Sequence, residues 1–345
     1  MGTLRRRAGS RQRAPNLSDR SQTAPLPVRP SLLLAGLVLS IALAVPVATA
    51  APARERNLPI VGFGEQRPDV FSNPHWHDLD LKPTRFVVGW DALRFGWQRA
   101  ETDAWVHAAL AAGARPLLAL TRSRTDSRTG VVPSTKAWLK QFKAFRARYP
   151  QVKDYLVWNE ANHCSQPVCH KPERVAAYYD AAVTACRRCN IVGADVLDTS
   201  SMAWYVEHFQ AAAKHRVRLW GLHNYVDANN LRTTGTRRLL QLTKGQIWFT
   251  ETGGLVKRKT TSPIKFPQSV SHAAKVTRFV LDRLANLSPR IRRVYLYHFE
   301  WQGPTASWDS GLLSPHGKPR PAYTVVARWA VSAAKARKAR ARASR

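Results

Sequence analysis

Beyond residue 57 the chain alternates between short apolar runs that end in polar residues and longer stretches with helical periodicity. The short runs are rich in Val, Leu, Ile and aromatic residues, a pattern typical of buried β-strands. Eight runs of this kind occur, at 59–66, 84–91, 116–123, 154–160, 190–198, 219–225, 246–251 and 294–301.

The stretches between these runs place apolar residues on one helical face, most clearly at 101–115, 135–149, 172–188, 202–215 and 271–287. Strands that alternate with helices indicate a parallel sheet. Eight such units over about 270 residues predict a single α/β domain, a (β/α)8 TIM barrel, over residues 57–330. A doubly wound sheet is the alternative, but it normally carries a G-x-G-x-x-G turn after its first strand, and GFGEQRP does not match.

Two of the predicted strands end in a glutamate. YLVWNE runs from apolar Tyr155 into Asn159 and Glu160, and IWFTETGG carries Glu251. In a (β/α)8 barrel the carboxyl ends of the strands meet at one mouth, where catalytic groups lie. The two strands are the fourth and seventh, so their carboxylates can face each other across the ring. Most enzymes that cleave a glycosidic bond use two facing carboxyl groups, one to protonate the leaving oxygen and one to attack the anomeric carbon or activate water.

These residues make the sequence resemble the retaining glycoside hydrolases of clan A, over most of residues 58–330. The resemblance implies that Glu160 is the acid/base and that Glu251 is the nucleophile. It also implies that Asn159 hydrogen-bonds the 2-hydroxyl of the sugar.

Further positions fit the same resemblance. Arg85, in the second strand, matches an arginine that supports the nucleophile. His223 and Tyr225 are two residues apart in GLHNYVD, so both face one side of the sixth strand. Trp301 matches a tryptophan that closes the eighth strand as a sugar platform. Each also has a structural interpretation: a core ion pair for Arg85, and core packing for His223 and Trp301.

Four other polar residues end predicted strands and are candidates for sugar subsites: Glu65, Asp91, Arg122 and Asp198. Retention requires the two catalytic carboxyl groups to stand about 5 to 5.5 Å apart, whereas inversion needs about 6.5 to 9.5 Å. We expect Arg85 to keep Glu251 ionised. We expect a dry site, together with the growing charge on Glu251, to raise the pKa of Glu160.

The four cysteines fall into two pairs, Cys164 with Cys169 and Cys186 with Cys189, on either side of the predicted helix at 172–188. A helix of about 15 residues separates the pairs by roughly 20 Å. Disulfide geometry allows only about 4.4 to 6.8 Å between Cα atoms. The layout therefore predicts one disulfide within each pair and no four-cysteine zinc site.

No cofactor or metal is expected. The two histidines of NPHWHD, His75 and His77, lie two apart at a predicted helix start, so they point in different directions.

The first 50 residues have the features of a signal peptide. A basic segment precedes the apolar run Leu32–Val45, and Ala48-Thr49-Ala50 resembles a cleavage site. We therefore expect a secreted or extracytoplasmic protein. Without cleavage, Leu32–Ala53 is long enough to anchor the chain in a membrane. At the other end, residues 331–345 read as a basic disordered tail.

The formal net charge is +32, which favours anionic surroundings such as a cell envelope. An Arg-rich composition that serves solubility is the simpler interpretation. The sequence thus predicts a monomeric exported glycosidase with a carbohydrate substrate, electrostatic association with the envelope and no specific nucleic acid. The alternative is a catalytically inactive barrel that binds carbohydrate or polyanions.

Overall fold

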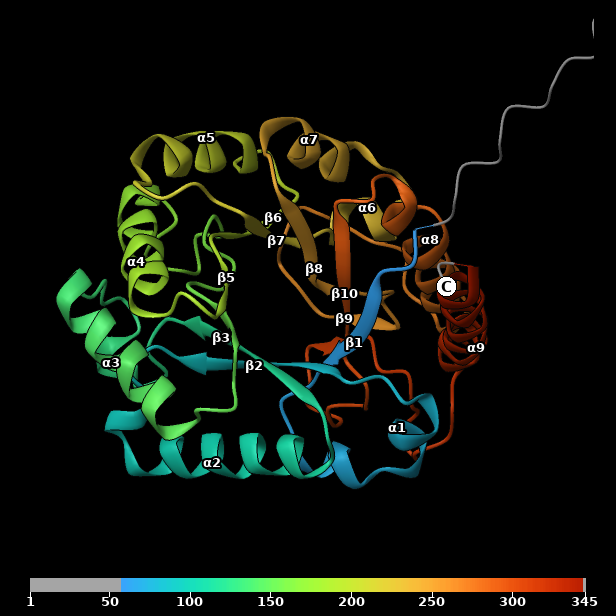
Figure 1. The fold of residues 1–345 in the computed structure, drawn as a ribbon. Coiled ribbons are helices and arrows are strands. Elements are labelled where there is room, and N and C mark those ends of the chain that lie inside the picture. Colours follow the sequence, from blue (N-terminus) through green and yellow to red (C-terminus); the bar gives the residue numbers. More distant parts are fainter. Residues whose placement is uncertain (1–56, 344–345) are drawn as a thin grey trace, which may run out of the picture. The chain divides into compact units, whose positions relative to one another are not determined.

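The computed structural model describes residues 57–343, which form a ring of strands surrounded by helices (Figure 1). The parallel strands are β1 (Ile60–Gly64), β2 (Pro83–Gly89), β3 (Arg115–Thr121), β4 (Asp154–Leu156), β5 (Asn190–Val192), β6 (Asp195–Leu197), β7 (Leu219–His223), β8 (Gln246–Thr252) and β10 (Ile291–Tyr297). They pair in the order β5-β4-β3-β2-β1-β10-β8-β7-β6. A separate antiparallel pair joins β9 (Lys257–Arg258) to β11 (Trp308–Asp309).

The α-helices are α1 (Pro74–Leu79), α2 (Gly96–Ala111), α3 (Thr135–Arg148), α4 (Pro172–Ala185), α5 (Met202–Ala212), α6 (Tyr225–Asn229), α7 (Thr234–Leu242), α8 (Val270–Asp282) and α9 (Pro321–Ala343). Short 3-10 turns occur at Pro68–Ser72, Ala92–Arg94, Asp126–Arg128 and Leu284–Asn286. The longer helices lie outside the strands (Figure 1).

Each of the eight predicted runs forms a strand, and the fifth run is broken into β5 and β6. β5 pairs with β4, whereas β6 pairs with β7. Between them, the backbone N–H of Gly193 donates to the carbonyl of Leu219 at 2.9 Å. The two edges of the sheet are therefore consecutive segments of the chain, so the ring is nearly closed. The prediction of a (β/α)8 barrel is confirmed.

Strand β3 shows how the core is divided. Leu117 and Ala119 pack with Trp248 and Tyr295, in a small apolar cluster contributed by several strands. Leu118, one residue out of phase, belongs to the larger cluster that includes residues of the helices. Because side chains alternate across a strand, the first cluster fills the barrel and the second lies between barrel and helices.

The closed end of the barrel holds a buried ion pair. Asp154, the first residue of β4, is fully buried and accepts hydrogen bonds from Arg293 at 2.5 Å and Arg115 at 3.0 Å. Asn190 Nδ2 also donates to Asp154 at 2.6 Å. Every oxygen of this carboxylate has a partner, so the charge is compensated in place.

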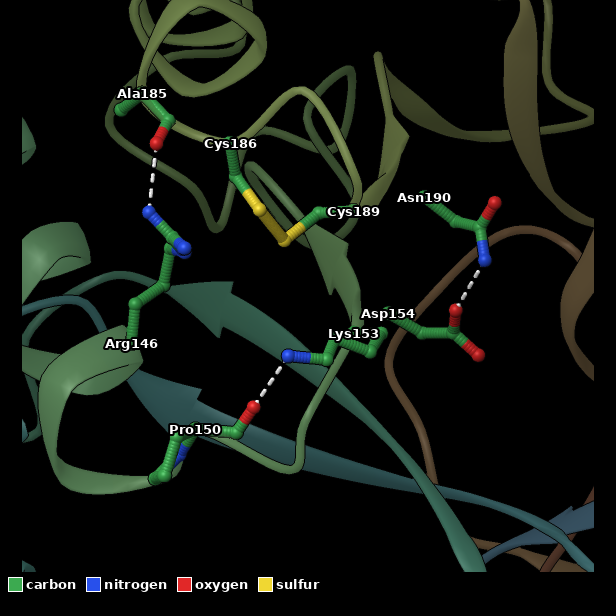
Figure 2. Close-up of a disulfide and its surroundings, with 8 residues drawn as sticks. All are labelled: Arg146, Pro150, Lys153, Asp154, Ala185, Cys186, Cys189 and Asn190. Atoms are coloured by element: carbon green, nitrogen blue, oxygen red, sulfur yellow. Dashed lines mark hydrogen bonds between the residues drawn. A yellow bond between two sulfur atoms is a disulfide. The ribbon is translucent and has the colours of Figure 1, made fainter.

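The same end carries a disulfide between Cys186 and Cys189, whose Cα atoms lie 5.4 Å apart (Figure 2). It closes the turn between α4 and β5, next to the Asn190–Asp154 hydrogen bond (Figure 2). This predicted disulfide is confirmed. The predicted Cys164–Cys169 disulfide is not formed, since both residues are unbonded thiols.

The prediction of a disordered tail at 331–345 is wrong for the described part, because α9 continues to Ala343. Ala, Lys and Arg are strong helix formers, and they make up most of this segment. Buried Ala333 also fixes the helix on the domain. None of the helices within 57–343 is long and apolar enough to cross a membrane. The predicted signal segment, and the Leu32–Ala53 anchor with it, lie outside the described residues.

Candidate active site

A cleft of about 450 Å³ opens at the carboxyl ends of the strands. Among the residues that line it are Asn159, Glu160, His223, Tyr225 and Glu251. Arg85 lies against this group, in contact with the carboxylate of Glu251. Trp301 is not among the residues that line the cleft, and neither are the subsite candidates Glu65, Asp91 and Arg122.

Glu251 reaches the cleft because β8 carries one extra residue. Gly221 of β7 pairs with Trp248, and His223 pairs with Glu251, so two residue steps along β7 correspond to three along β8. The same irregularity appears toward β10. Trp248 points into the barrel, so strict alternation would direct Glu251 outward toward the helices. The bulge reverses that phase and brings Glu251 to the side of His223.

Two donors fix the Glu251 carboxylate. Arg85 Nη1 donates to Oε2 at 2.7 Å, and the Tyr225 hydroxyl donates to Oε1 at 3.0 Å. Arg85 is 1% exposed and also donates to the side-chain oxygen of Asn159. Burial, followed by the charge of Glu251, holds the pKa of Tyr225 well above its usual value, so this hydroxyl stays a donor. These two donors therefore hold the Glu251 carboxylate in a fixed orientation.

Glu160 lies just beyond β4, in a tight turn. Its φ of 50° is in the left-handed region, which residues other than glycine rarely adopt. The turn places its side chain on the cleft wall, where Oε1 lies 3.2 Å from His223 Nδ1. One oxygen of Glu160, one of Glu251 and one ring nitrogen of His223 all lie within 4.8 Å of one another.

Asp195, which the sequence analysis did not select, completes this group. It is fully buried at the start of β6, with Oδ2 2.8 Å from His223 Nε2. Its other oxygen accepts a hydrogen bond from Thr250. An aspartate inside the apolar run NIVGADVLD was the available signal. It was missed because the run was taken as one strand ending at Asp198.

The ionisation of this group differs from what the sequence led us to expect. Burial lowers the pKa of His223, but the charges of Asp195 and Glu251 outweigh it and raise the pKa to about 10. Burial raises the pKa of Glu160, but the hydrogen bond and charge of His223 outweigh it and lower the pKa. The expectation of a raised Glu160 pKa is therefore wrong, because the neighbouring His223 favours the ionised form of this carboxyl.

The other four strand-end candidates have structural contacts. Glu65 is buried and accepts backbone N–H groups of the segment after β10, including Glu300 at 3.1 Å. Asp91 pairs with Arg128, and Arg122 donates to the carbonyl of Ser165. Asp198 lines the cleft, but its oxygens accept the first backbone N–H groups of α6.

A tryptophan that the sequence analysis did not select, Trp308, lines the cleft together with Tyr225, Phe266 and Tyr297. Trp308 lines the cleft and packs edge-on against Tyr225, with ring centroids 4.9 Å apart. Arg258 also lines the cleft, and its guanidinium lies over the Trp308 ring, 5.6 Å from the ring centroid. Trp301 follows β10 but is not among the lining residues. Its predicted role as the sugar platform stays a prediction, and β11 brings Trp308, from further along the chain, to the cleft.

Comparisons with known proteins agree with this geometry. The family model described as "Glycosyl hydrolase catalytic core" matches residues 130–324, which include both Glu160 and Glu251. No curated protein sequence matches the chain.

Solved structures share the fold at low sequence identity. A monomeric beta-xylosidase from Caulobacter crescentus CB15 superposes with a TM-score of 0.58 at 16% identity, covering 79% of this chain and 68% of that one. An endo-1,4-beta-xylanase from Caldicellulosiruptor owensensis gives 0.59 at 12% identity, covering 79% and 97%. A triple mutant of an endo-beta-1,4-glucanase from Xanthomonas axonopodis pv. citri gives 0.53 at 14%, covering 79% and 99%.

The family match spans more than half of the chain, and the glutamate pair lies inside it. The chain therefore belongs to the glycosyl hydrolase catalytic core family and is a glycosidase.

Proposed function

We propose that the chain is an exported glycosidase that cleaves an O-glycosidic bond of an oligo- or polysaccharide with retention of anomeric configuration. One observation carries the retaining mechanism: oxygens of Glu160 and Glu251 lie within 4.8 Å of each other. Retaining enzymes hold their carboxyl groups about 5 to 5.5 Å apart, and inverting enzymes need about 6.5 to 9.5 Å to fit a water.

Glu251 is the nucleophile in this proposal. Its anionic oxygen attacks the anomeric carbon, and the bond from that carbon to the leaving oxygen breaks. Arg85 and Tyr225 hold the two oxygens of this carboxylate in place by hydrogen bonds. Because these donors are already in position, the attack requires little reorganisation of the site.

Glu160 protonates the leaving oxygen, and His223 is the source of its proton. The imidazolium Nδ1 faces Glu160 Oε1 at 3.2 Å, so the two groups share one proton. The charge of Glu251 is among the causes that raise the pKa of His223. As Glu251 forms its covalent bond this charge disappears, so the proton becomes easier to pass to Glu160.

The second step regenerates the enzyme. Glu160, now a carboxylate, takes a proton from a water molecule that attacks the anomeric carbon. The glycosyl bond to Glu251 breaks, and Glu251 leaves as an anion beside Arg85. The proton taken from water replaces the one given to the leaving group.

The names of three fold relatives, a beta-xylosidase, an endo-1,4-beta-xylanase and an endo-beta-1,4-glucanase, support a proposal for the substrate class. We extend this to β-glycosides for the present chain. A panel of aryl β-glycosides and cell-wall polysaccharides tests the substrate. Trapping with a 2-deoxy-2-fluoro glycoside, followed by peptide mass spectrometry, tests the nucleophile. We expect the label on Glu251; a label on Glu160, or hydrolysis with no trapped intermediate, contradicts the proposal.

The remaining part of the proposal is that the enzyme is exported from the cytoplasm. The signal-like residues 1–50 and the Cys186–Cys189 disulfide support it, because disulfides persist in oxidising compartments. The net charge of +32 supports retention on an anionic envelope. Fractionation of expressing cells should recover the enzyme outside the cytoplasm and release it with salt. Cytoplasmic recovery, or salt-insensitive partitioning, contradicts this part alone.

A further inference from the structure

The loop between β4 and α4 brings three soft ligand residues together. The side-chain ligand atoms of Cys164, Cys169 and His170 all lie within 4.8 Å of one another. Cys164 Sγ and His170 Nε2 are 3.5 Å apart. Cys164 and His170 are exposed, and Cys169 is half-buried, so an ion from solvent has access to the group.

The loop that carries these residues is anchored to the barrel. Gln166 is buried, and its side-chain oxygen accepts hydrogen bonds from Trp158 Nε1 and from the Thr121 hydroxyl, both at 3.1 Å. The backbone N–H of Cys169 donates to Gln166, and Arg122 donates to the carbonyl of Ser165. The three side chains are thus held together by an ordered loop, which reduces the entropy lost when a ligand binds.

The separation fits a tetrahedral zinc site. With Zn–S near 2.3 Å and Zn–N near 2.0 to 2.1 Å, the sulfur and nitrogen atoms of such a site lie about 3.5 Å apart. The observed Cys164–His170 distance has this value. Two thiolates also neutralise Zn²⁺, so binding adds no charge to a chain that already carries +32.

A disulfide is the competing arrangement for the two cysteines. The structure bonds Cys186 to Cys189 but leaves Cys164 and Cys169 as thiols, so the two pairs are treated differently within one chain. A disulfide also gives no role to His170, which lies next to both sulfurs. We propose that Cys164, Cys169 and His170 bind one Zn²⁺ ion, with water as the fourth ligand.

The proposed ion would restrict the motion of the segment that follows the proposed acid/base Glu160. Residues 160–170 run from Glu160, and His163 from the same segment lines the cleft. The proposal does not depend on the roles given to Glu160 and Glu251, since metal binding is read out directly.

Cobalt substitution tests the site. Full-length protein carrying Cys186→Ser and Cys189→Ser, with its fold checked by circular dichroism, is reduced and stripped of metal under argon, then titrated with Co²⁺. We expect one equivalent to produce thiolate-to-cobalt charge-transfer bands with tetrahedral visible bands, and one equivalent of Zn²⁺ to abolish them. The same titration is repeated with unreduced wild-type protein, in which the Cys186–Cys189 bond is intact. This control shows whether a negative result comes from misfolding of the Cys186→Ser, Cys189→Ser protein.

Single substitutions then assign the ligands. Cys164→Ser, Cys169→Ser and His170→Ala should each weaken Zn²⁺ binding at least about tenfold in competition with a chromophoric chelator, a typical loss when one zinc-site partner is removed. His163→Ala, adjacent in sequence but outside the group, should leave it unchanged. A flat cobalt titration, bands that survive the three substitutions, or a Cys164–Cys169 disulfide in unreduced wild-type protein prepared with zinc would overturn the proposal.

Discussion

Each end of the barrel holds a buried carboxylate beside an arginine, Asp154 at the closed end and Glu251 at the mouth, but the mouth also carries a second carboxylate, Glu160. At the closed end Asp154 accepts hydrogen bonds from Arg115, Arg293 and Asn190, so each of its oxygens is occupied. At the mouth, Glu160 lines the cleft and has one such partner among the described residues, His223, at 3.2 Å. The same chemical groups thus stabilise the fold at one end and remain available for reaction at the other.

The difference lies in the balance of charge. Asp154 stands between two arginines, so its anion is fully compensated. At the mouth, Arg85 and protonated His223 stand against Asp195, Glu251 and Glu160. In this group of three carboxyl groups, the proton that His223 shares with Glu160 is the one that general-acid catalysis needs.

Replacing Glu251 by Gln removes the nucleophile and should have the largest effect. We expect kcat/KM to fall at least about 10⁴-fold on every substrate, because no covalent intermediate can form. Steady-state kinetics with several aryl glycosides measures this, and thermal unfolding checks that the variant is folded. Substantial activity in Glu251→Gln would show that the mouth does not differ from the closed end in the way described.

Replacing Glu160 by Ala should give a loss that depends on the leaving group. Removing the proton donor should cost about 10² to 10⁴-fold for poor leaving groups and much less for very good ones, which need no protonation. Azide should restore turnover of activated substrates and yield a glycosyl azide of retained configuration. A uniform loss across leaving groups, without azide rescue, would argue against the acid/base role.

Replacing Asp154 by Ala tests the closed end. Leaving Arg293 buried without its partner should reduce the free energy of unfolding by about 3 to 5 kcal/mol. The kcat of the folded fraction should stay near that of the wild type, because the site lies at the other end. Denaturant unfolding with parallel kinetics separates these outcomes. A large loss of kcat at unchanged stability would contradict the division of roles.

Replacing Asp195 by Asn should move the alkaline limb of the pH profile. The pKa of His223 is about 10, so the proton shared with Glu160 is present below this pH and lost above it. Activity should therefore fall as the pH rises through about 10. Without the negative charge of Asp195 the pKa of His223 drops, and the limb should shift to lower pH. Asp198→Asn, a nearby buried aspartate that bonds backbone N–H groups, is the control and should leave the limb in place.

Replacing Trp308 by Ala should have the smallest effect. Loss of one aromatic wall of the cleft should raise KM about threefold to tenfold, with little change in kcat. The matched control is Trp301→Ala, because Trp301 lies outside the cleft. A larger KM effect for Trp301 than for Trp308 would support the interpretation made from the sequence.

The barrel was predictable because each strand is a contiguous apolar run, and contiguous patterns are visible in one sequence. Glu160 and Glu251 were visible for the same reason, as carboxylates at the ends of such runs. Asp195 was missed because it depends on a break in the fifth strand. Trp308 was missed because the β9–β11 pair brings a distant loop over the cleft.

The protonation of the site residues could not be predicted from the sequence either. The lowered pKa of Glu160 depends on a histidine that is adjacent in space and 63 residues away in the chain. The bulge in β8 is another example, since it changes which way Glu251 points without altering the residue pattern. In each case the missing information is a contact between strands, which a single sequence does not contain.

The stereochemistry of the first-formed product tests the central claim most directly. Wild-type enzyme is mixed with a β-glycoside that it hydrolyses, and proton NMR follows the anomeric signals before mutarotation. The account predicts that the β-anomer appears first, since two displacements at Glu251 restore the original configuration. Initial formation of the α-anomer would show single displacement by water and would contradict the assignment of Glu251 as nucleophile.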